Sequence, residues 1–456
     1  MTQVETDVEV DSGRPLPSVK KIALATFVGT AVEWYDYFIY GLTAALVLGQ
    51  LFFPEFSSTA GTLAAFATFA VGYIARPLGG ILMGHFGDRV GRKSMLVISL
   101  LTMGCTTVLI GLLPGFDTIG IWAPILLVLL RVIQGIAAGG EWGGAVLVAV
   151  ENAPPNKRTL YGSFPQMGVA GGLILANLVY LILTTVVSQE TLLAWAWRIP
   201  FLISALLVIV GLYVRLGIAE SPEFARALKE QDRAKLPIVE AFRTGWKGIV
   251  LGALSYGGSS AISYIFVTYL LSYAPKQIGY SYTTILTLTL VGTTLWMLIM
   301  PFSSMLADRI GRGKVLLWGW VGLGLGGTAL MPAADTGSVP VLATAMLVVA
   351  IFVGVTYGPF AAFFSDMFPP RVRYSGSSMC YQIGSIVGGG FAPLIAASLF
   401  ATWGTSTPIT VYLLVTSLVG FGTMAILVRT HIGRAADNRP TAGKPVTPVD
   451  ARFAVE

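Results

Sequence analysis

The sequence predicts an all-α integral membrane protein, with twelve transmembrane helices arranged as two six-helix halves. Three observations predict this fold class. The chain of 456 residues is 55% hydrophobic and only 11% charged, whereas soluble domains carry about 25% charged residues. Apolar segments near the roughly 20 residues that a bilayer requires recur along the whole chain, and two polar motifs recur six segments apart. Most of the chain is therefore expected to lie in lipid.

The apolar segments divide the chain into five parts. They lie at residues 22–50, 59–84, 94–113, 121–150, 161–187 and 198–218, and then at 247–274, 283–306, 314–332, 340–367, 374–400 and 406–429. The expected parts are a disordered polar tail at 1–19, a first six-helix bundle at 20–218, a linker at 219–246, a second bundle at 247–429 and a second tail at 430–456. The linker sequence from Pro222 to Glu230 predicts a short amphipathic helix.

Lys and Arg residues gather in alternate short connections. One set, together with the linker, holds Arg89, Arg92, Lys93, Lys157, Arg158, Arg309, Arg312, Lys314, Arg371 and Arg373. The opposite set holds Lys276 and, at a helix edge, Arg198. By the positive-inside rule, the rich side and both termini are expected in the cytoplasm, with the protein in the inner or plasma membrane. The net charge of +6 therefore reflects membrane orientation, and no nucleic-acid partner is expected.

Two motifs repeat between the halves. Asp88-Arg89-Val90-Gly91-Arg92, after the second span, matches Asp308-Arg309-Ile310-Gly311-Arg312, after the eighth. The fifth and eleventh spans share the spacing Gln-x-Gly-x-x-x-Gly, at Gln166, Gly168 and Gly172 and at Gln382, Gly384 and Gly388. Parallel six-span repeats with a solute site between them near the midplane are a transporter architecture, and small residues at such spacing let helices pack closely.

These residues resemble the major facilitator superfamily. Its loop signature is similar to Gly84 through Lys93 and to the copy at Asp308 to Arg312, and a second signature is similar to Arg131-Val132-Ile133-Gln134-Gly135. Four further strings resemble the metabolite–proton symporter branch, which includes 2-oxoglutarate, citrate, shikimate and proline/betaine porters. They are Glu33 to Gly41, Ala75 to Gly80, Gly139 to Gly144 and Glu220 to Phe224.

The resemblance implies uptake of a small organic acid together with protons, by alternating access. Two alternatives keep the fold: proton-coupled uptake of a zwitterionic osmolyte such as proline or betaine, and uncoupled facilitation. The tail after Arg429 is short and shows no heptads, whereas osmosensing porters of this branch often end in a long coiled coil. The fifth span has Gly168-Val169-Ala170-Gly171-Gly172 and lacks the Gly-Pro that is typical of drug–proton antiporters.

Two carboxylates near the middle of the first span are the candidates for proton coupling. Glu33 and Asp36 lie three residues apart, which predicts one helix face, and Tyr40 follows one turn later as a candidate solute contact. A carboxylate at the bilayer centre costs about 2.5–3.5 kcal/mol on insertion scales. Because burial disfavours its charged form and access to water restores it, such a group can load and release protons. The alternative is a fixed interhelical ion pair, and Asp36, the deeper residue, is the first choice.

Three further charged residues of the first half are candidates. Arg131 is expected to hold the solute carboxylate or to modulate the acids of the first span, the alternative being a helix-locking pair. Glu141 is assigned to coupling or to structural pairing. Arg76 either lines the solute site or snorkels to the membrane interface.

The second half has no charge in the middle of its spans, so neutral groups are expected to contact the solute there. The seventh span offers Ser255, Tyr256, Ser259, Ser260, Ser263 and Tyr264, the tenth Tyr357, and the eleventh Tyr381 and Gln382. With Gln166 from the first half, the candidate contacts among them are Tyr256, Tyr264, Tyr357 and Gln382, and ordinary helix packing is the alternative for each.

The duplicated charged motifs are expected to be gates at the cytoplasmic ends of the helices, and topogenic charge alone is the alternative. The candidate gating residues are Gly84, Asp88, Arg89, Gly91, Arg92, Asp308, Arg309, Gly311 and Arg312. They are expected to form tight-turning loops.

No enzyme chemistry is indicated. The sequence shows no His/Cys metal cluster, no nucleophile–base pair and no phosphate-binding Gly-Lys-Ser/Thr loop in a plausible cavity. No metal or cofactor is expected. The expected partners are a small-molecule substrate, protons and the lipid bilayer, and the protein is expected to be a monomer.

Overall fold

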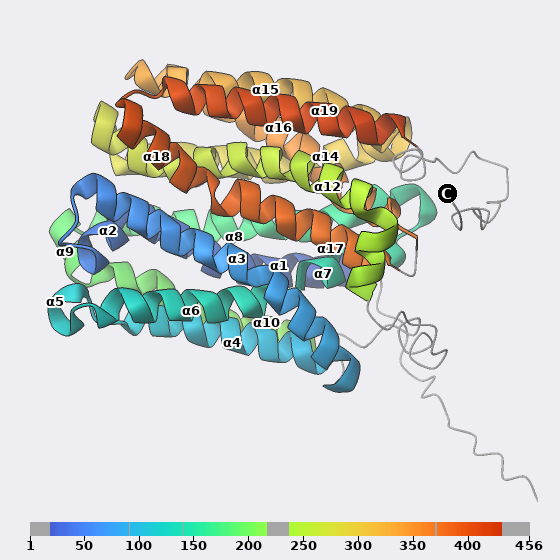
Figure 1. Ribbon diagram of the computed structural model, residues 1–456, viewed down its shortest axis with the longest axis horizontal. Helices are drawn as coiled ribbons and strands as arrows, with labels where there is room; N and C mark the ends of the chain where they lie inside the picture. Colours follow the sequence, from blue (N-terminus) through green and yellow to red (C-terminus); the bar gives the residue numbers. More distant parts are fainter. Residues whose placement is uncertain (1–18, 91, 140, 217–236, 370–371, 431–456) are drawn as a thin grey trace, which may run out of the picture.

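The computed structural model describes residues 19–90, 92–139, 141–216, 237–369 and 372–430. Within these residues all regular structure is helical, and the helices group into twelve long spans that run side by side (Figure 1). Because the number of crossings is even, α1 begins and α19 ends at the same end of the bundle. We call this the terminal end and the opposite end the distal end.

The first half contains the first six spans. Its elements are α1 (Val19–Thr43), η1 (Ala44–Leu48), α2 (Gly49–Phe52), α3 (Ser58–Val90), α4 (Arg92–Leu112), α5 (Phe116–Ile119), α6 (Trp122–Ala138), α7 (Glu141–Glu151), η2 (Pro155–Lys157), α8 (Arg158–Val186), α9 (Gln189–Ala194), η3 (Ala196–Arg198) and α10 (Ile199–Leu216). The first span joins α1, the π-helical η1 and α2, and the fourth joins α6 and α7.

The second half contains the other six spans. Its elements are α12 (Pro237–Tyr264), η4 (Ile265–Tyr269), α13 (Leu270–Tyr273), η5 (Ala274–Ile278), α14 (Tyr282–Ile310), α15 (Arg312–Asp335), α16 (Val339–Asp366), α17 (Arg373–Gly384), η6 (Ser385–Gly390), α18 (Ala392–Trp403) and α19 (Thr407–Arg429). Helix α12 is kinked at Gly245. The amphipathic helix expected at Pro222 to Glu230 lies outside the described residues.

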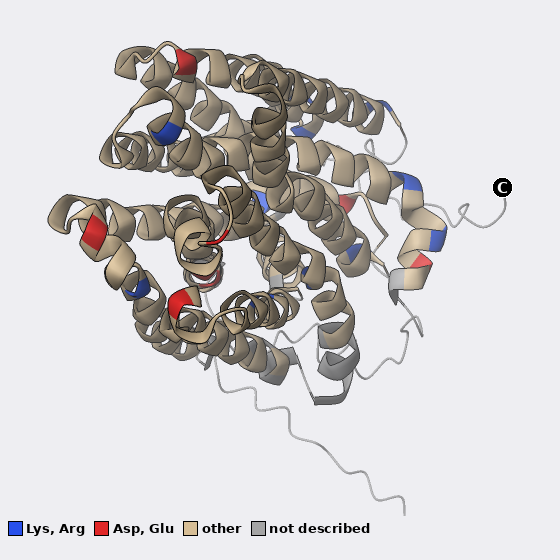
Figure 2. Cartoon of the chain, turned by 60° about the vertical axis from the view of Figure 1, so that its left-hand side comes forward, with Lys and Arg blue, Asp and Glu red and all other residues tan. Residues whose placement is uncertain are grey.

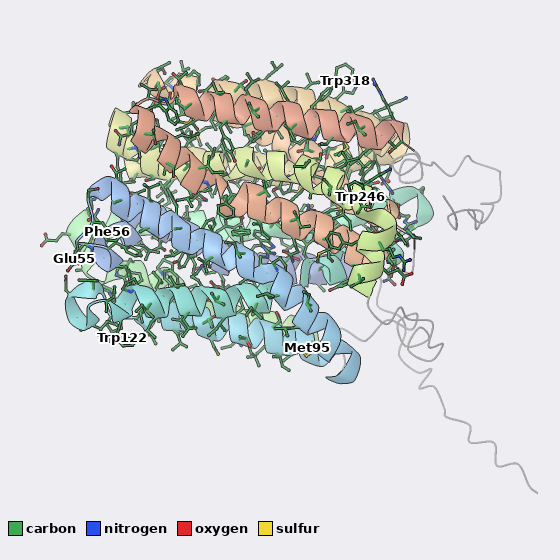
Figure 3. The ribbon with its side chains drawn as sticks, viewed as in Figure 1. Glu55, Phe56, Met95, Trp122, Trp246 and Trp318 are labelled. Atoms are coloured by element: carbon green, nitrogen blue, oxygen red, sulfur yellow. The ribbon has the colours of Figure 1, made fainter. Side chains whose placement is uncertain are left out.

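Length and hydropathy alone identify ten membrane-crossing helices among the described residues. The first span is not among them, and it carries Glu33 and Asp36 in its middle. The third contributes only the shorter apolar helix Val97–Leu112. Charged side chains are sparse along the ribbon (Figure 2). The outer surface is apolar, with Trp122 and Trp318 projecting outward (Figure 3). This surface suits contact with lipid tails.

Packing within the two halves follows the same plan. In the first half α1 packs along α8, and in the second α12 packs along α17 and η6. The repeated glycines explain this closeness, since a Cβ atom on Gly172 would lie 2.6 Å from the Ala31 carbonyl oxygen and one on Gly388 would lie 2.1 Å from that of Gly257. The halves meet where α8 packs on α14 and α16, and where α3 packs on η6 and α18.

The sequence predicts tight-turning loops for the duplicated charged motifs, but the structure places most of their residues in helices. Helix α3 continues to Val90, so Gly84, Asp88 and Arg89 belong to its last turns, and Arg92 begins α4. In the second copy, Asp308 and Arg309 lie in the last turn of α14. A single residue makes that turn: Gly311 has a φ of 105°, a conformation that glycine adopts without steric cost.

Candidate functional site

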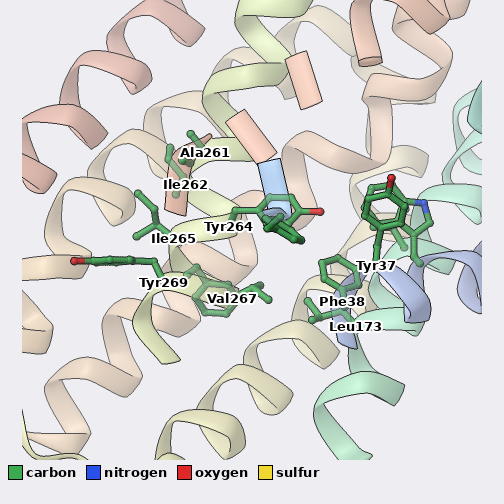
Figure 4. Packing of buried hydrophobic residues seen from close by; sticks show 14 of the residues in the cluster. Tyr37, Phe38, Leu173, Ala261, Ile262, Tyr264, Ile265, Val267 and Tyr269 are labelled. Atoms are coloured by element: carbon green, nitrogen blue, oxygen red, sulfur yellow. The ribbon is translucent and has the colours of Figure 1, made fainter. Parts of the chain in front are cut away.

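Aromatic and hydroxyl side chains from both halves surround a small space at the centre of the bundle, which we call the ring pocket. It is lined by Trp34, Phe38, Val169, Tyr256, Ser260, Ser263, Tyr264, Val267, Trp296, Tyr357 and Ser385. Phe38 of the first half stacks on Tyr264 of the second, with ring centroids 5.9 Å apart (Figure 4). The pocket has room for about one water molecule. The described conformation is therefore almost closed around its centre.

A second small space lies on the other side of Trp34, and we call it the arginine pocket. It is lined by Thr30, Glu33, Trp34, Tyr37, Arg76, Met103, Ala138 and Trp142. Trp34 lines both pockets, so they are adjacent. Glu33 and Arg76, two of the residues singled out from the sequence, thus meet at one pocket, although no ion pair joins them.

Arg76 lies in a cage of four aromatic rings. Its guanidinium carbon is 5.1 Å from the ring centre of Trp34, 5.0 Å from Tyr37, 5.4 Å from Tyr73 and 5.9 Å from Tyr381. Each such contact contributes about 0.5–2 kcal/mol. The side chain is only 2% exposed, so it does not snorkel to the interface. Three rings come from the first half and one, Tyr381, from the second.

Several buried polar atoms near the pockets have no hydrogen-bond partner in the described part of the chain. They are Nε and Nη1 of Arg76 and Nε2 of Gln166. A buried polar group without a partner costs about 1–3 kcal/mol. The unpartnered atoms of Arg76 lie at the arginine pocket and are open to a polar ligand there.

Asp36 faces away from both pockets. Its carboxylate accepts a hydrogen bond of 2.5 Å from the Ser204 hydroxyl on α10, and Thr107 of α4 lies beside it. Glu33 and Asp36 are therefore neighbours on α1 that reach different surroundings: Glu33 lines the arginine pocket, and Asp36 is buried between helices of the first half.

Arg131 also lies outside the lining of both pockets. Its Nη1 donates to Gln134 Oε1 at 2.5 Å, its Nη2 donates to the Phe69 carbonyl oxygen at 3.2 Å, and its guanidinium lies 3.9 Å from the ring centre of Tyr40. Gln134 Nε2 in turn donates to the Thr107 hydroxyl at 2.7 Å. A polar chain thus leads from Arg131 through Gln134 and Thr107 towards Asp36, without an ion pair to any described carboxylate.

An aromatic closure lies between the pockets and the terminal end. Trp142 of α7 stacks on Tyr381 of α17, with centroids 3.8 Å apart and planes at 8°. Trp142 Nε1 donates to Gln166 Oε1 at 2.7 Å, and Gln382 Nε2 donates to the Gly139 carbonyl oxygen at 2.7 Å. Gln166 and Gln382, equivalent residues of the repeated motif, therefore both take part in this closure.

A polar latch joins the halves at the terminal end, and we call it the terminal latch. The Asp308 carboxylate accepts hydrogen bonds from the backbone N–H groups of Thr159 and Leu160, both 3.1 Å long, at the N-terminus of α8. An anion is favourable there because the first N–H groups of a helix have no helical partner. Asp366 forms ion pairs with Arg158 at 3.1 Å and Arg312 at 2.7 Å.

The second copy of the charged motif is thus placed in an inter-half contact. For the first copy, the side chains of Asp88, Arg89 and Arg92 lie outside the described part, as does all of Gly91, and the surroundings of Gly84 are likewise outside it. The side chain of Glu141 is also outside it. Arg309 is exposed at the end of α14.

The structure brings together five of the residues expected at the centre. Glu33 and Arg76 line the arginine pocket, and Tyr256, Tyr264 and Tyr357 line the ring pocket. Asp36, Tyr40 and Arg131 form a separate region inside the first half. Sequence reasoning missed four residues, Trp34, Trp142, Ser204 and Ser385. Trp34 and Trp142 stand inside the strings Glu33 to Gly41 and Gly139 to Gly144, of which Glu33, Asp36, Tyr40 and Glu141 were the candidates.

The two six-helix halves, the central pockets and the latch define a class of protein: a secondary transporter of the membrane. The chain matches the Major Facilitator Superfamily over residues 26–393, and it belongs to that family. It is therefore a multi-pass membrane transporter and not an enzyme.

Curated relatives cover nearly the whole chain. The Escherichia coli (strain K12) inner membrane metabolite transport protein YhjE is 41% identical over 424 residues, 91% of this chain and 95% of that protein. The shikimate transporter of the same organism is 40% identical and covers 90% of this chain and 95% of its own. The proline/betaine transporter of Escherichia coli (strain K12) is 31% identical, over 98% of this chain and 89% of that protein. This chain therefore belongs among the metabolite porters of the superfamily.

A solved structure supports the fold. The crystal structure of a D-xylose-proton symporter superposes with a TM-score of 0.69 at 19% identity, over 91% of this chain and 98% of that one. At this identity the likeness establishes the twelve-helix fold and carries no information on the solute.

Proposed function

We propose that this transporter is a symporter that imports a small organic acid together with protons by alternating access. The observation that carries the proposal is Arg76, a buried guanidinium between the pockets that has no ion pair with a described carboxylate and has two unpartnered nitrogens. A solute carboxylate supplies the missing partner, because guanidinium and carboxylate form strong charge-assisted hydrogen bonds.

Protons are carried, in this proposal, by carboxylates of the first span. Glu33 lines the same pocket as Arg76, and Asp36 lies at the end of the polar chain from Arg131. Burial penalises an ionised carboxylate, and water entering as the halves rock relieves the penalty. Either group can therefore bind a proton on one side and release it on the other. Glu141 remains a further candidate.

The gating proposal follows from the contacts between halves. Closure at the terminal end uses the terminal latch and the stack of Trp142 on Tyr381. At the distal end, Lys276 Nζ of the second half donates a hydrogen bond of 3.2 Å to Thr62 Oγ1, in the first turns of α3. Solute entry requires one of these two closures to open, because the pockets between them are almost filled.

The remaining proposals concern topology. The protein is placed in the inner or plasma membrane. Because the terminal end carries the excess of Lys and Arg, that end is assigned to the cytoplasm. Residues 20–218 and 247–429 act as the two moving bundles, joined by the linker 219–246, and the working unit is a monomer. A shikimate transporter and a proline/betaine transporter among the relatives support metabolite uptake but differ in the class of solute.

The proposal is tested by uptake of labelled carboxylates into proteoliposomes. An inward proton gradient should increase accumulation, and a protonophore should abolish it. The Asp36→Asn variant should lose gradient-driven accumulation while retaining exchange of solute across the membrane, since exchange needs no net proton movement. Uptake that is unchanged by protonophore would refute coupling, and wild-type accumulation in Asp36→Asn would remove Asp36 from it. Accumulation of glycine betaine but of no carboxylate would favour the osmolyte alternative.

A further inference from the structure

We propose that two buried hydroxyls, those of Ser204 and Thr107, are positioning groups that govern when Asp36 binds and releases a proton. They lie on the sixth and third spans, so they reach Asp36 from two helices other than its own. The inference rests on the proposed function, in which Asp36 is a candidate proton carrier, and it goes further by naming the side chains that act on that carboxyl. It follows from the donors and acceptors around Asp36.

The Ser204 hydroxyl bonds differently from other serines inside the helices. Buried helical hydroxyls can donate to a carbonyl three or four residues back on their own helix, and those of Ser263 and Ser417 do so. Ser204 instead donates to Asp36 Oδ1 at 2.5 Å, on a helix 168 residues away in the chain. Because a hydroxyl has one proton, the whole donor capacity of Ser204 serves this carboxyl.

The Thr107 hydroxyl has one proton and two acceptors that compete for it. It donates to the Met103 carbonyl oxygen at 2.9 Å and also lies within hydrogen-bonding reach of Asp36. It accepts from Gln134 Nε2 at 2.7 Å. The Gln134 amide has a fixed orientation, because its Oε1 accepts from Arg131, which can only donate. Gln134 therefore leaves the proton of Thr107 free for Met103 or Asp36.

The ionised and neutral forms of Asp36 require different positions of the Thr107 proton. An ionised carboxylate accepts from both hydroxyls, so the Thr107 proton turns from the Met103 carbonyl to Asp36. A neutral carboxyl carries its own proton, which it can donate to the Thr107 oxygen while Ser204 still donates to its other oxygen. Rotation of one hydroxyl thus converts one arrangement into the other. Hydrogen bonds to the charged form favour that form, so the two hydroxyls assist release of the proton.

Hydroxyls rather than a cation surround Asp36, which is only 2% exposed. It forms no ion pair in the part of the chain that the structure describes. The titratable group that acts on it from its own helix is the Tyr35 phenol. Arg131 of α6 reaches it only through intervening side chains, and Glu33 and Arg76 line the arginine pocket. Removing one hydroxyl should therefore have a large effect on the proton of Asp36.

Infrared spectroscopy of the full-length protein in liposomes follows this proton without any solute. A protonated carboxyl gives a C=O stretching band that disappears on ionisation, and the band that is missing in Asp36→Asn belongs to Asp36. The midpoint is the pH at which half of this band is lost. Ser204→Ala should raise the midpoint by about one pH unit or more, because the ionised form loses a donor. Thr107→Val, similar in shape, should shift it in the same direction, and Thr107→Ser should restore it.

Thr106→Val is the matched control for these variants. Thr106 is also a buried threonine of α4, but its hydroxyl donates to the Thr102 and Met103 carbonyl oxygens of its own helix, both at 2.8 Å. Its midpoint should equal that of the wild type, and a shift as large as that of Thr107→Val would contradict the assignment. Ser204→Ala tests the inference independently if Thr107→Val does not fold. Unchanged midpoints, or a wild-type band that does not respond to pH, would overturn the inference.

Failure of this inference and failure of the proposed function give different results. Proton-driven uptake that is lost in Asp36→Asn, together with unchanged midpoints in Ser204→Ala and Thr107→Val, leaves the symporter standing and removes the two hydroxyls from its mechanism. Uptake that ignores the proton gradient, together with shifted midpoints, refutes coupling and leaves the hydroxyls as positioning groups for Asp36.

Discussion

The two halves of the molecule share a plan of packing and differ in the chemistry of their central side chains. Helix α8 meets α1 through Gly172, and η6 meets α12 through Gly388, at equivalent places of the repeat. The first half, however, directs Glu33 and Arg76 to the pockets and buries Asp36 and Arg131 nearby. The second half contributes Tyr256, Tyr264, Tyr357 and serine hydroxyls.

This difference separates two tasks that one solute imposes. In the proposed function, a charged group of the solute and the accompanying proton need charged side chains, and these stand in the first half. The neutral body needs shape and hydrogen bonds, which the second half offers. Because both halves keep the same glycine contacts, each can move as a unit while the groups that recognise the solute differ.

Adding a charge to the second half should have the largest effect on transport. Ser260→Asp places a carboxylate in the lining of the ring pocket, where it repels the carboxylate of the solute. We expect at least a tenfold loss of organic-acid uptake in proteoliposomes. Ser260→Asn, similar in size and neutral, is the matched control and should retain most activity. Equal losses in the two variants would mean that size rather than charge is decisive there.

Much of the fold could be predicted from the sequence because its signals are local. Length and hydropathy identified ten of the helices among the described residues, and the charged and glycine motifs identified the repeat. The rotation of each helix about its axis could not be read in this way. Asp36 meets Ser204, which lies 168 residues away, and the cage of Arg76 includes Tyr381 of the other half. Such contacts depend on tertiary packing, so Glu33 and Asp36 were assigned one face although they reach different surroundings.

A second variant tests whether the terminal latch holds the two halves together. Asp308→Ala removes the acceptor of the Thr159 and Leu160 amides. A hydrogen bond to a charged group contributes about 1.5–3 kcal/mol, so hydrogen–deuterium exchange at the start of α8 should rise about tenfold or more. Lys314→Ala, an exposed charge of the same segment, should leave that exchange unchanged. Unaltered exchange in Asp308→Ala would show that the latch does not hold the halves together.

The smallest expected effect tests the shared packing. Gly172→Ala and Gly388→Ala each force a methyl group against a backbone carbonyl, and overpacking costs about 1–3 kcal/mol. Both should lower the thermal unfolding midpoint by similar amounts. Gly144→Ala, where a Cβ atom meets nothing within 4 Å, should not lower it. A drop in only one of the two halves would contradict their equivalence.

Proton movement with the solute is the central claim, and external pH reports it most directly. Proteoliposomes are suspended in weakly buffered medium without a gradient, and an organic acid that the protein binds is added outside as its salt. The medium should become more alkaline at a rate that follows solute entry, and both signals should vanish in Arg76→Gln. Solute entry through the wild-type protein with no change in external pH would contradict the account.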